Sequence, residues 1–332
     1  MPSPGRLAKI LVGLAVSAGL LLYLFWNADL RAIGAHLAKT HWGWLTLSVG
    51  FNLVSIWVRA RRWSYLFPPG ARPAGLFSAV MIGYMGNNLL PLRAGEIVRV
   101  YVVARRGQRF WTAVATLVVE RVLDALAVVL ILAGLLLAIP VPRQLQWAAL
   151  VFLGADLAIM AILGVMAAAP DRLQGLTRAL ARHSPRLEAR LSKVLGTFTE
   201  GLQGVRTPPH LIPIIGWSAA IWVLWALGVW VALWAAHLDL PMAAAWAVLA
   251  FVGLGVSLPS SPGFVGVIQA ATVLALALFG VPHTEALSFS LLLHASQFVP
   301  VTAAGLILLI VEQVSLAEVT QGLRKPASPS RS

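Results

Sequence analysis

Three ionisable residues inside an apolar segment are the most promising chemical feature of this sequence. Glu120, Arg121 and Asp124 occur within residues 110–139, a stretch otherwise composed almost wholly of apolar side chains. An ionised group at the centre of a membrane helix costs at least about 2.5 kcal/mol, so each of the three needs a partner. Arg121 and Asp124 stand three positions apart and are expected to pair within one helix. Glu120 is left to pair with another segment.

A second group of polar residues surrounds a break in the apolar segment at residues 74–106. Pro91 and Gly95 interrupt this segment, because proline removes a backbone donor and glycine permits unusual dihedral angles. The backbone groups freed at such a break must be satisfied by protein or water, which predicts a polar cavity. We expect the lining of this cavity to include Asn87, Asn88, Arg93, Glu96 and Arg99.

The arginines of this first break suit one kind of ligand. A guanidinium group forms paired hydrogen bonds with phosphate oxygens such as those of a lipid head group. Glu120 is expected to meet Arg93 or Arg99 across the cavity. Two interpretations are open for these charges: they bind a substrate, or they form an ion network that only stabilises the segment, with Glu96 paired to one of the two arginines. For Glu120, Arg121 and Asp124, a purely structural ion network and a moving relay are both open.

A second break lies at residues 242–279, where Pro259, Pro262 and Gly263 follow one another closely. Polar but uncharged side chains accompany it. We predict that they form the other part of a substrate site, and they are Ser260, Ser261, Gln269, His294 and Gln297. His294 is expected to be a hydrogen-bonded structural residue rather than a proton relay. Asp156 is expected to pair with another helix and to lie outside the site.

The two breaks share a short sequence pattern. Leu90-Pro91-x-x-x-Gly95 occurs in the first and Leu258-Pro259-x-x-x-Gly263 in the second. Broken apolar segments at corresponding positions of two halves are typical of transporters built from inverted repeats, whose binding site lies near the middle of the bilayer. We therefore predict two re-entrant helix hairpins that enter from opposite faces. Two full spans at residues 242–279 fit the pattern equally well.

The elements that must position these residues are transmembrane helices. Hydrophobic residues make up 59% of the 332 residues and charged residues only 11%, whereas a soluble domain typically has about 25% charged residues. The sequence contains no cysteine, which excludes disulfides and thiolate chemistry. The predicted fold is an all-α polytopic membrane protein with two hairpins and six full spans, each near the roughly 20 residues that cross a bilayer. The expected spans are 7–26, 42–58, 110–139, 147–169, 211–236 and 286–314.

The distribution of basic residues predicts the orientation of these spans. Lys and Arg accumulate in cytoplasmic loops. With both breaks treated as re-entrant, only three of the 25 basic residues fall on the outer side, namely Arg31, Lys39 and Arg143. We therefore expect both termini in the cytoplasm and the chain in the cytoplasmic (inner) cell membrane. The predicted parts are one transmembrane domain, 1–314, with a cytoplasmic amphipathic loop at 170–209, and a basic cytoplasmic tail, 315–332.

Taken together, these motifs resemble one known family. The pattern Gly86-Asn-Asn88-Leu-Leu-Pro91-x-Arg93-x-Gly95-Glu96-x-x-Arg99 is followed by Arg105-Arg106, by Glu120-Arg121-x-x-Asp124 and by Pro259-x-x-Pro262-Gly263-x-x-Gly266. In combination they resemble the transmembrane, or flippase-like, domain of lysylphosphatidylglycerol synthases over nearly the whole chain. The resemblance implies a lipid-translocating domain in the cytoplasmic membrane.

Two departures from the family limit what the resemblance implies. Full-length synthases continue into a soluble aminoacyl-transfer domain, which does not follow here, so synthase activity is not expected. Gln269 stands where the family often has glutamate, which argues against an acidic role in the second half.

The leading hypothesis is a lipid translocase, not an enzyme, that moves an anionic or modified phospholipid or glycolipid between leaflets without a metal or other cofactor. The net charge of +13 fits anionic lipids better than nucleic acid, because the basic residues flank apolar spans. One alternative is an intramembrane lipid-modifying enzyme, either a glycosyltransferase or a hydrolase that uses Ser261 with His294, although Ser261 is not in a Gly-x-Ser-x-Gly motif. The other is a scaffold that binds a separate lipid-modifying enzyme through residues 172–206.

Overall fold

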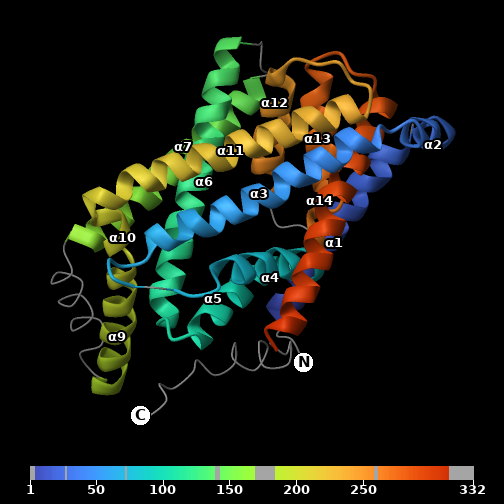
Figure 1. Ribbon diagram of the computed structural model, residues 1–332. Helices are drawn as coiled ribbons and strands as arrows, with labels where there is room; N and C mark the ends of the chain where they lie inside the picture. Colours follow the sequence, from blue (N-terminus) through green and yellow to red (C-terminus); the bar gives the residue numbers. More distant parts are fainter. Residues whose placement is uncertain are drawn as a thin grey trace.

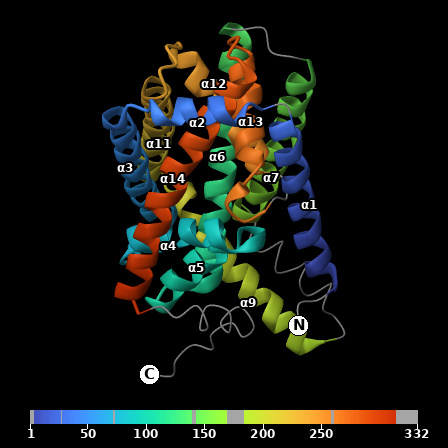
Figure 2. The same cartoon turned by 90° about the vertical axis from the view of Figure 1, so that its right-hand side faces the viewer.

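The computed structural model describes residues 4–26, 28–71, 73–138, 143–168, 184–257 and 261–313. Every element in these residues is a helix (Figures 1 and 2), and in Figure 1 the long helices run in two main directions, some upright and others slanted across them. In chain order the elements are α1 (Pro4–Trp26), α2 (Leu30–Ala38), α3 (Trp42–Leu66), α4 (Leu76–Leu89), η1 (Pro91–Arg93), α5 (Gly95–Arg105), α6 (Phe110–Ala138), α7 (Arg143–Ala168), α9 (Pro185–Gly201), α10 (Gln203–Arg206), α11 (Pro208–Ala235), α12 (Met242–Val256), η2 (Pro262–Phe264), α13 (Val267–Ala277) and α14 (His283–Val311).

Three of the described helices, α6, α11 and α14, are long and apolar enough to cross a membrane. α1 and α2 meet the same criterion only as a pair bent by 90°, and α7 contributes a shorter apolar segment, Leu153–Met166. The predicted all-helical fold is thus confirmed, while the number of six full spans stays a prediction. The predicted spans 7–26 and 42–58 leave α2 in an external loop. Asp29 caps this helix by accepting hydrogen bonds from the amides of Arg31 and Ala32 (2.9 and 3.1 Å).

Two helices, α3 and α14, end several residues away from their predicted ends. α3 continues past the predicted end at Val58 as far as Leu66. Arg59 and Arg62 are therefore part of a helix and fully buried, whereas the predicted span 42–58 leaves both in a cytoplasmic loop. The physical reason is that carboxylates of α6 neutralise both guanidinium groups. α14 ends at Val311 instead of residue 314.

Each predicted break is a helix hairpin in the structure. α4 and α5 pack together across η1 and form the first hairpin, while α12 and α13 pack together across η2 and form the second hairpin. Both turns contain a residue with positive φ, Leu92 at 60° and Gly263 at 68°. The packing of the first hairpin needs Gly95, because a Cβ atom there would lie 2.0 Å from the carbonyl oxygen of Gly83.

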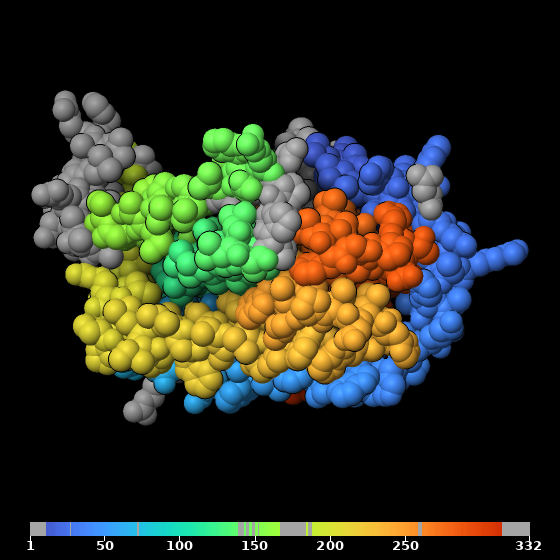
Figure 3. All heavy atoms as spheres, turned by 90° about the horizontal axis from the view of Figure 1, so that it is seen from above, coloured from blue at the N-terminus to red at the C-terminus, as the bar shows by residue number. Residues whose placement is uncertain are grey.

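The two hairpins meet at their turns, since η1 contacts η2 and α4 also contacts η2. Figure 2 shows the first hairpin near the end of the molecule where α1 begins and α14 ends, whereas α12 begins near the opposite end. Figure 3 shows that opposite end, where second-half segments in yellow and orange lie beside the green α6 and α7 and the blue segments of the N-terminal helices. Apolar side chains form two main buried cores, one chiefly in α11–α14 and the other chiefly in α3–α6.

The predicted amphipathic loop, 170–209, is described from residue 184 onward. Its helix α9 packs against the start of α6, where the hydroxyl of Thr112 donates to the carbonyl oxygen of Thr197 (3.0 Å). Residues 170–183, the predicted tail at 315–332, and the predicted break and site residues Pro259 and Ser260 lie outside the described residues.

Candidate functional site

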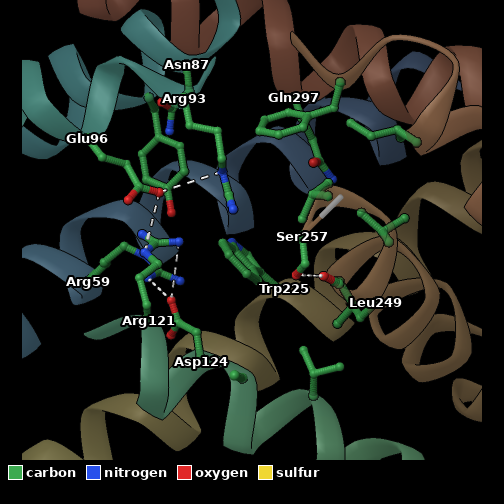
Figure 4. Close-up of a pocket in the computed structure, with 18 of the residues that line it drawn as sticks. Arg59, Asn87, Arg93, Glu96, Arg121, Asp124, Trp225, Leu249, Ser257 and Gln297 are labelled. Carbon is green, nitrogen blue, oxygen red and sulfur yellow. Dashed lines mark hydrogen bonds and ion pairs between the residues drawn. The ribbon is translucent and has the colours of Figure 1, made fainter. Parts of the chain in front are cut away.

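A cavity of about 520 Å³ lies where the two hairpins approach each other. Its walls come from α3, the first hairpin, α6, α7, α11, α12, η2, α13 and α14. Figure 4 shows charged side chains on one side of the cavity and the neutral residues Leu249, Ser257 and Gln297 on the other. Nine of the residues predicted from the sequence line it, namely Asn87, Asn88, Arg93, Glu96, Arg121, Asp124, Gly263, His294 and Gln297.

A buried ion network forms the charged side of the cavity. Its centre is Glu120, which is 0% exposed and accepts two hydrogen bonds from Arg99 (2.9 and 2.5 Å) and one from Arg59 (3.0 Å). Asp124 accepts hydrogen bonds from Arg59 (2.6 Å) and Arg62 (2.9 Å). The eight members of the ion network are Arg59, Arg62, Arg93, Arg99, Arg121, Glu96, Glu120 and Asp124.

The pairing within the ion network agrees only in part with the prediction. Of the two partners predicted for Glu120, Arg93 and Arg99, the structure pairs it with Arg99. Arg121 and Asp124 approach to 3.9 Å, but the short hydrogen bonds to Asp124 come from Arg59 and Arg62, which sequence analysis missed. The available signal was the spacing of these two arginines, three positions apart at the end of an apolar run, which places both on one helix face.

The arginines of the ion network fall into two groups by exposure. The side chains of Arg59, Arg62 and Arg99 are at most 4% exposed and hold the carboxylates of α6. Arg93 and Arg121 are 36% and 34% exposed and make longer contacts with Glu96, at 3.8 and 3.5 Å. Removing one partner of such a buried ion pair would leave the other charge uncompensated, which is strongly unfavourable. The guanidinium groups of Arg93 and Arg121 are therefore the ones most accessible to a ligand in the cavity.

The ion network carries an excess of positive charge. Its five arginines face three carboxylates, all of them within the described residues. Aromatic rings next to the arginines supply further contacts, with the guanidinium carbon of Arg59 5.0 Å from the ring centre of Trp225 and that of Arg93 5.5 Å from Phe264. Tyr84, Trp222 and Trp225 line the cavity, although sequence analysis did not select them. A wall with this excess of positive charge favours the binding of an anionic group.

The second hairpin contributes a neutral hydrogen-bonded pair. The side-chain oxygen of Gln269 accepts a hydrogen bond from the amide of Gly266 (2.7 Å), which leaves its NH₂ group to bond to Nδ1 of His294 (2.8 Å). Gln269 is buried and does not line the cavity, whereas His294 does. Gln269 therefore orients the ring of His294 from outside the cavity. The prediction that His294 is a hydrogen-bonded residue is confirmed.

Three other residues that were predicted as site residues do not line the cavity. Glu120 and Arg99 lie behind its wall. The hydroxyl of Ser261 donates to the carbonyl oxygen of Val265 (3.2 Å) and does not line the cavity. The ring of His294 is held by Gln269, so the serine–histidine pair considered for an enzyme is not formed. Pro91 and Pro262 begin the turns η1 and η2, where they act as the predicted structural breaks.

Asn88 and Asp156 also line the cavity, and their contacts differ. The side-chain amide of Asn88 donates to the hydroxyl of Thr302 (2.8 Å), which ties the first hairpin to α14. Asp156 lines the cavity, contrary to the prediction that it pairs with another helix outside the site. Its Oδ2 atom is buried and has no hydrogen-bond partner among the described residues. Among the described residues, no group of three His, Asp or Glu side chains is arranged to hold a metal ion.

Comparison with known proteins places these features in a family. Residues 10–305 match the sequence profile described as the lysylphosphatidylglycerol synthase TM region. Every residue that lines the cavity falls within the matched range. Comparisons with curated proteins and with solved structures gave no match. The chain, a helical membrane protein, therefore belongs to the family of the lysylphosphatidylglycerol synthase transmembrane region.

Proposed function

We propose that this protein moves a lipid with an anionic head group between the two leaflets of the cytoplasmic membrane. The observation that carries the proposal is the cavity of about 520 Å³, because it joins the turns of both hairpins and has an arginine-rich wall. An anionic phospholipid or glycolipid would place its phosphate or acidic group against this wall while its acyl chains stay in the bilayer.

Arg93 and Arg121 are the residues proposed to contact the head group. Both line the cavity, and both are about one-third exposed. Their ion pairs with Glu96, at 3.8 and 3.5 Å, are longer than the hydrogen bonds that Arg59, Arg62 and Arg99 make to carboxylates, so a phosphate oxygen can compete for the guanidinium donors. Arg59, Arg62 and Arg99 would hold the helices in place during binding, because their charges are already neutralised by short hydrogen bonds to Glu120 and Asp124.

The proposed membrane arrangement has six spans and two re-entrant hairpins that are related as an inverted repeat. Three features support it: the shared Leu-Pro-x-x-x-Gly pattern, the positive φ in each turn, and the meeting of the two turns at the cavity. A transporter of this type rearranges one hairpin relative to the other, so that the cavity opens to each side in turn. Both termini would then be cytoplasmic, in agreement with the distribution of Lys and Arg.

The proposed activity is transport rather than catalysis. A hydrolase would need a serine next to a histidine and an acid that orients the histidine. Here the hydroxyl of Ser261 donates to a backbone carbonyl, and an uncharged amide, that of Gln269, occupies Nδ1 of His294. The polar groups of the cavity are arranged for binding, with guanidinium groups on one side and neutral side chains on the other.

Lipid exchange by purified protein in vesicles tests this function. A fluorescently labelled phosphatidylglycerol is placed in both leaflets, and the fraction accessible to an external quencher is followed over time. Wild-type protein should make the inner-leaflet label accessible. Arg93→Gln should slow this exchange about 10-fold to 100-fold, since a hydrogen bond to a charged group contributes about 1.5–3 kcal/mol.

Two further variants complete the experiment. Glu96→Gln should also slow exchange, because the carboxylate that positions Arg93 and Arg121 is removed. Arg31→Gln is the matched control, since Arg31 is exposed on α2 and does not line the cavity. Unchanged exchange in both Arg93→Gln and Glu96→Gln would contradict the proposed function, provided that the variants elute from size exclusion as the wild type does.

A further inference from the structure

Asp156 is a cavity carboxylate that the ion network does not use. It is the only acidic residue of α7 and lines the cavity together with Ile159, three positions later on the same helix face. The residue is 3% exposed, and its Oδ2 atom is buried without a hydrogen-bond partner in the part of the chain that the structure describes. No described residue forms an ion pair with it.

The other titratable groups around the cavity are already paired or neutral. α6, which packs against α7, presents Arg121 and Asp124 to the cavity. Each of the other lining carboxylates, Asp124 and Glu96, has at least one arginine partner. The remaining titratable residues of the lining come from α3, the first hairpin and α14, and they are Arg59, Tyr84, Arg93 and His294.

Paired and unpaired carboxylates differ in the free-energy cost of adding a proton. Adding a proton to Glu120 or Asp124 would leave buried guanidinium groups without their counter-charge, which is strongly unfavourable. An unpaired carboxylate in a membrane helix has the opposite balance, because the ionised form is costly to bury and the neutral form much less so. Asp156 can therefore take up and release a proton without breaking an ion pair.

The small exposed fraction of Asp156 favours a proton over a larger cation. An ammonium group of a lipid would need direct contact with several acceptor atoms. A side chain that is 3% exposed offers little surface for such contact. A proton needs only one water molecule in the cavity to reach the carboxylate oxygen.

We propose that Asp156 binds the proton that couples lipid movement to the proton gradient across the membrane, with one proton moved per lipid. The inference rests on the proposed translocation of lipid. When the cavity faces one side, the Oδ2 atom takes a proton from water on that side. When the cavity faces the other side, the same oxygen returns the proton to water there, and no covalent bond of the lipid changes.

A pH gradient across vesicles that contain the protein tests this coupling. Labelled phosphatidylglycerol is present in both leaflets, the membrane potential is held at zero with equal potassium and valinomycin, and the final distribution of label is measured. With one proton per lipid, a gradient of about one pH unit should give a leaflet ratio of about tenfold. In Asp156→Asn the ratio should be about one, and in Asp156→Glu it should stay close to the wild-type value. Asp239→Asn is the control, since Asp239 is exposed between α11 and α12 and lies outside the cavity lining.

The outcomes separate this inference from the proposed function. Lipid movement in the wild type with no response to the gradient overturns the coupling and leaves translocation intact, whereas absence of any lipid movement overturns both. An unaltered response in Asp156→Asn also overturns the coupling. If Asp156→Asn changes only the exchange of amine-bearing lipids, the residue binds a head group instead of a proton.

Infrared spectroscopy decides the case in which Asp156→Asn moves no lipid. A carboxyl band that titrates with pH in the wild type and is missing from the variant supports proton binding at this residue. If the wild type has no such band, the coupling is overturned.

Discussion

Glu120→Gln is the most direct test of the ion network. Glu120 is fully buried and accepts hydrogen bonds from Arg59, Arg99 and Arg121. Glutamine keeps the shape of the side chain but removes its charge. Removing one partner of a buried ion pair typically costs about 3–5 kcal/mol, because the remaining charge is left uncompensated. Among the described residues Glu120 is the only carboxylate paired with Arg99, so we expect a cost in this range.

The free energy of unfolding can be measured by titration with SDS in mixed micelles, followed by the fluorescence of the 13 tryptophans. Glu200→Gln is the matched control, because it removes the same charge from an exposed pair with Arg109. Exposed pairs contribute about 0–1 kcal/mol. The double variant of Glu120→Gln and Arg99→Gln should lose less than the sum of the single variants, with a coupling of about 0.5–3 kcal/mol.

The reasoning is refuted if Glu120→Gln is destabilised no more than Glu200→Gln. It is also refuted if the two substitutions at positions 120 and 99 are additive. Either result would mean that the bidentate contact of 2.9 and 2.5 Å does not hold the first hairpin to α6.

Two other predictions concern the first hairpin and the end of α14. Gly95→Ala places a Cβ atom 2.0 Å from the carbonyl oxygen of Gly83, so unfolding should become easier by at least about 1–3 kcal/mol, whereas Gly216→Ala, in open space on α11, should be neutral or slightly stabilising. A hydrogen bond from Arg106 holds the pKa of Glu312 below its usual value of 4.5, so this pair stabilises the protein above that pH and the contribution is lost as the pH falls through the lowered pKa. The difference in unfolding free energy between wild type and Glu312→Gln should therefore shrink between pH 7 and pH ~3, and a constant difference would show that the pair adds nothing.

Much of the fold and part of the site followed from the sequence alone. Low charge and long apolar runs require a bilayer, and a bilayer requires helices, since every backbone group must be satisfied within the segment. Proline and glycine at Pro91, Gly95, Pro262 and Gly263 were sufficient to predict both breaks, because these residues act through their own backbone. The pair between Glu120 and Arg99 was also predictable, since both belong to neighbouring segments of the chain.

Only the tertiary structure decided which distant charges meet. Arg59 and Arg62 lie about 60 positions before their partners on α6, and arginines at the end of an apolar run are ordinarily interpreted as cytoplasmic flanking charges. Asp156 was expected to have a partner because most buried charges do, yet the packing of α7 gives its Oδ2 atom no partner within the described residues. Charge and hydropathy are properties of single residues and can be read along the chain, whereas the pairing of a buried charge depends on which helix faces come into contact.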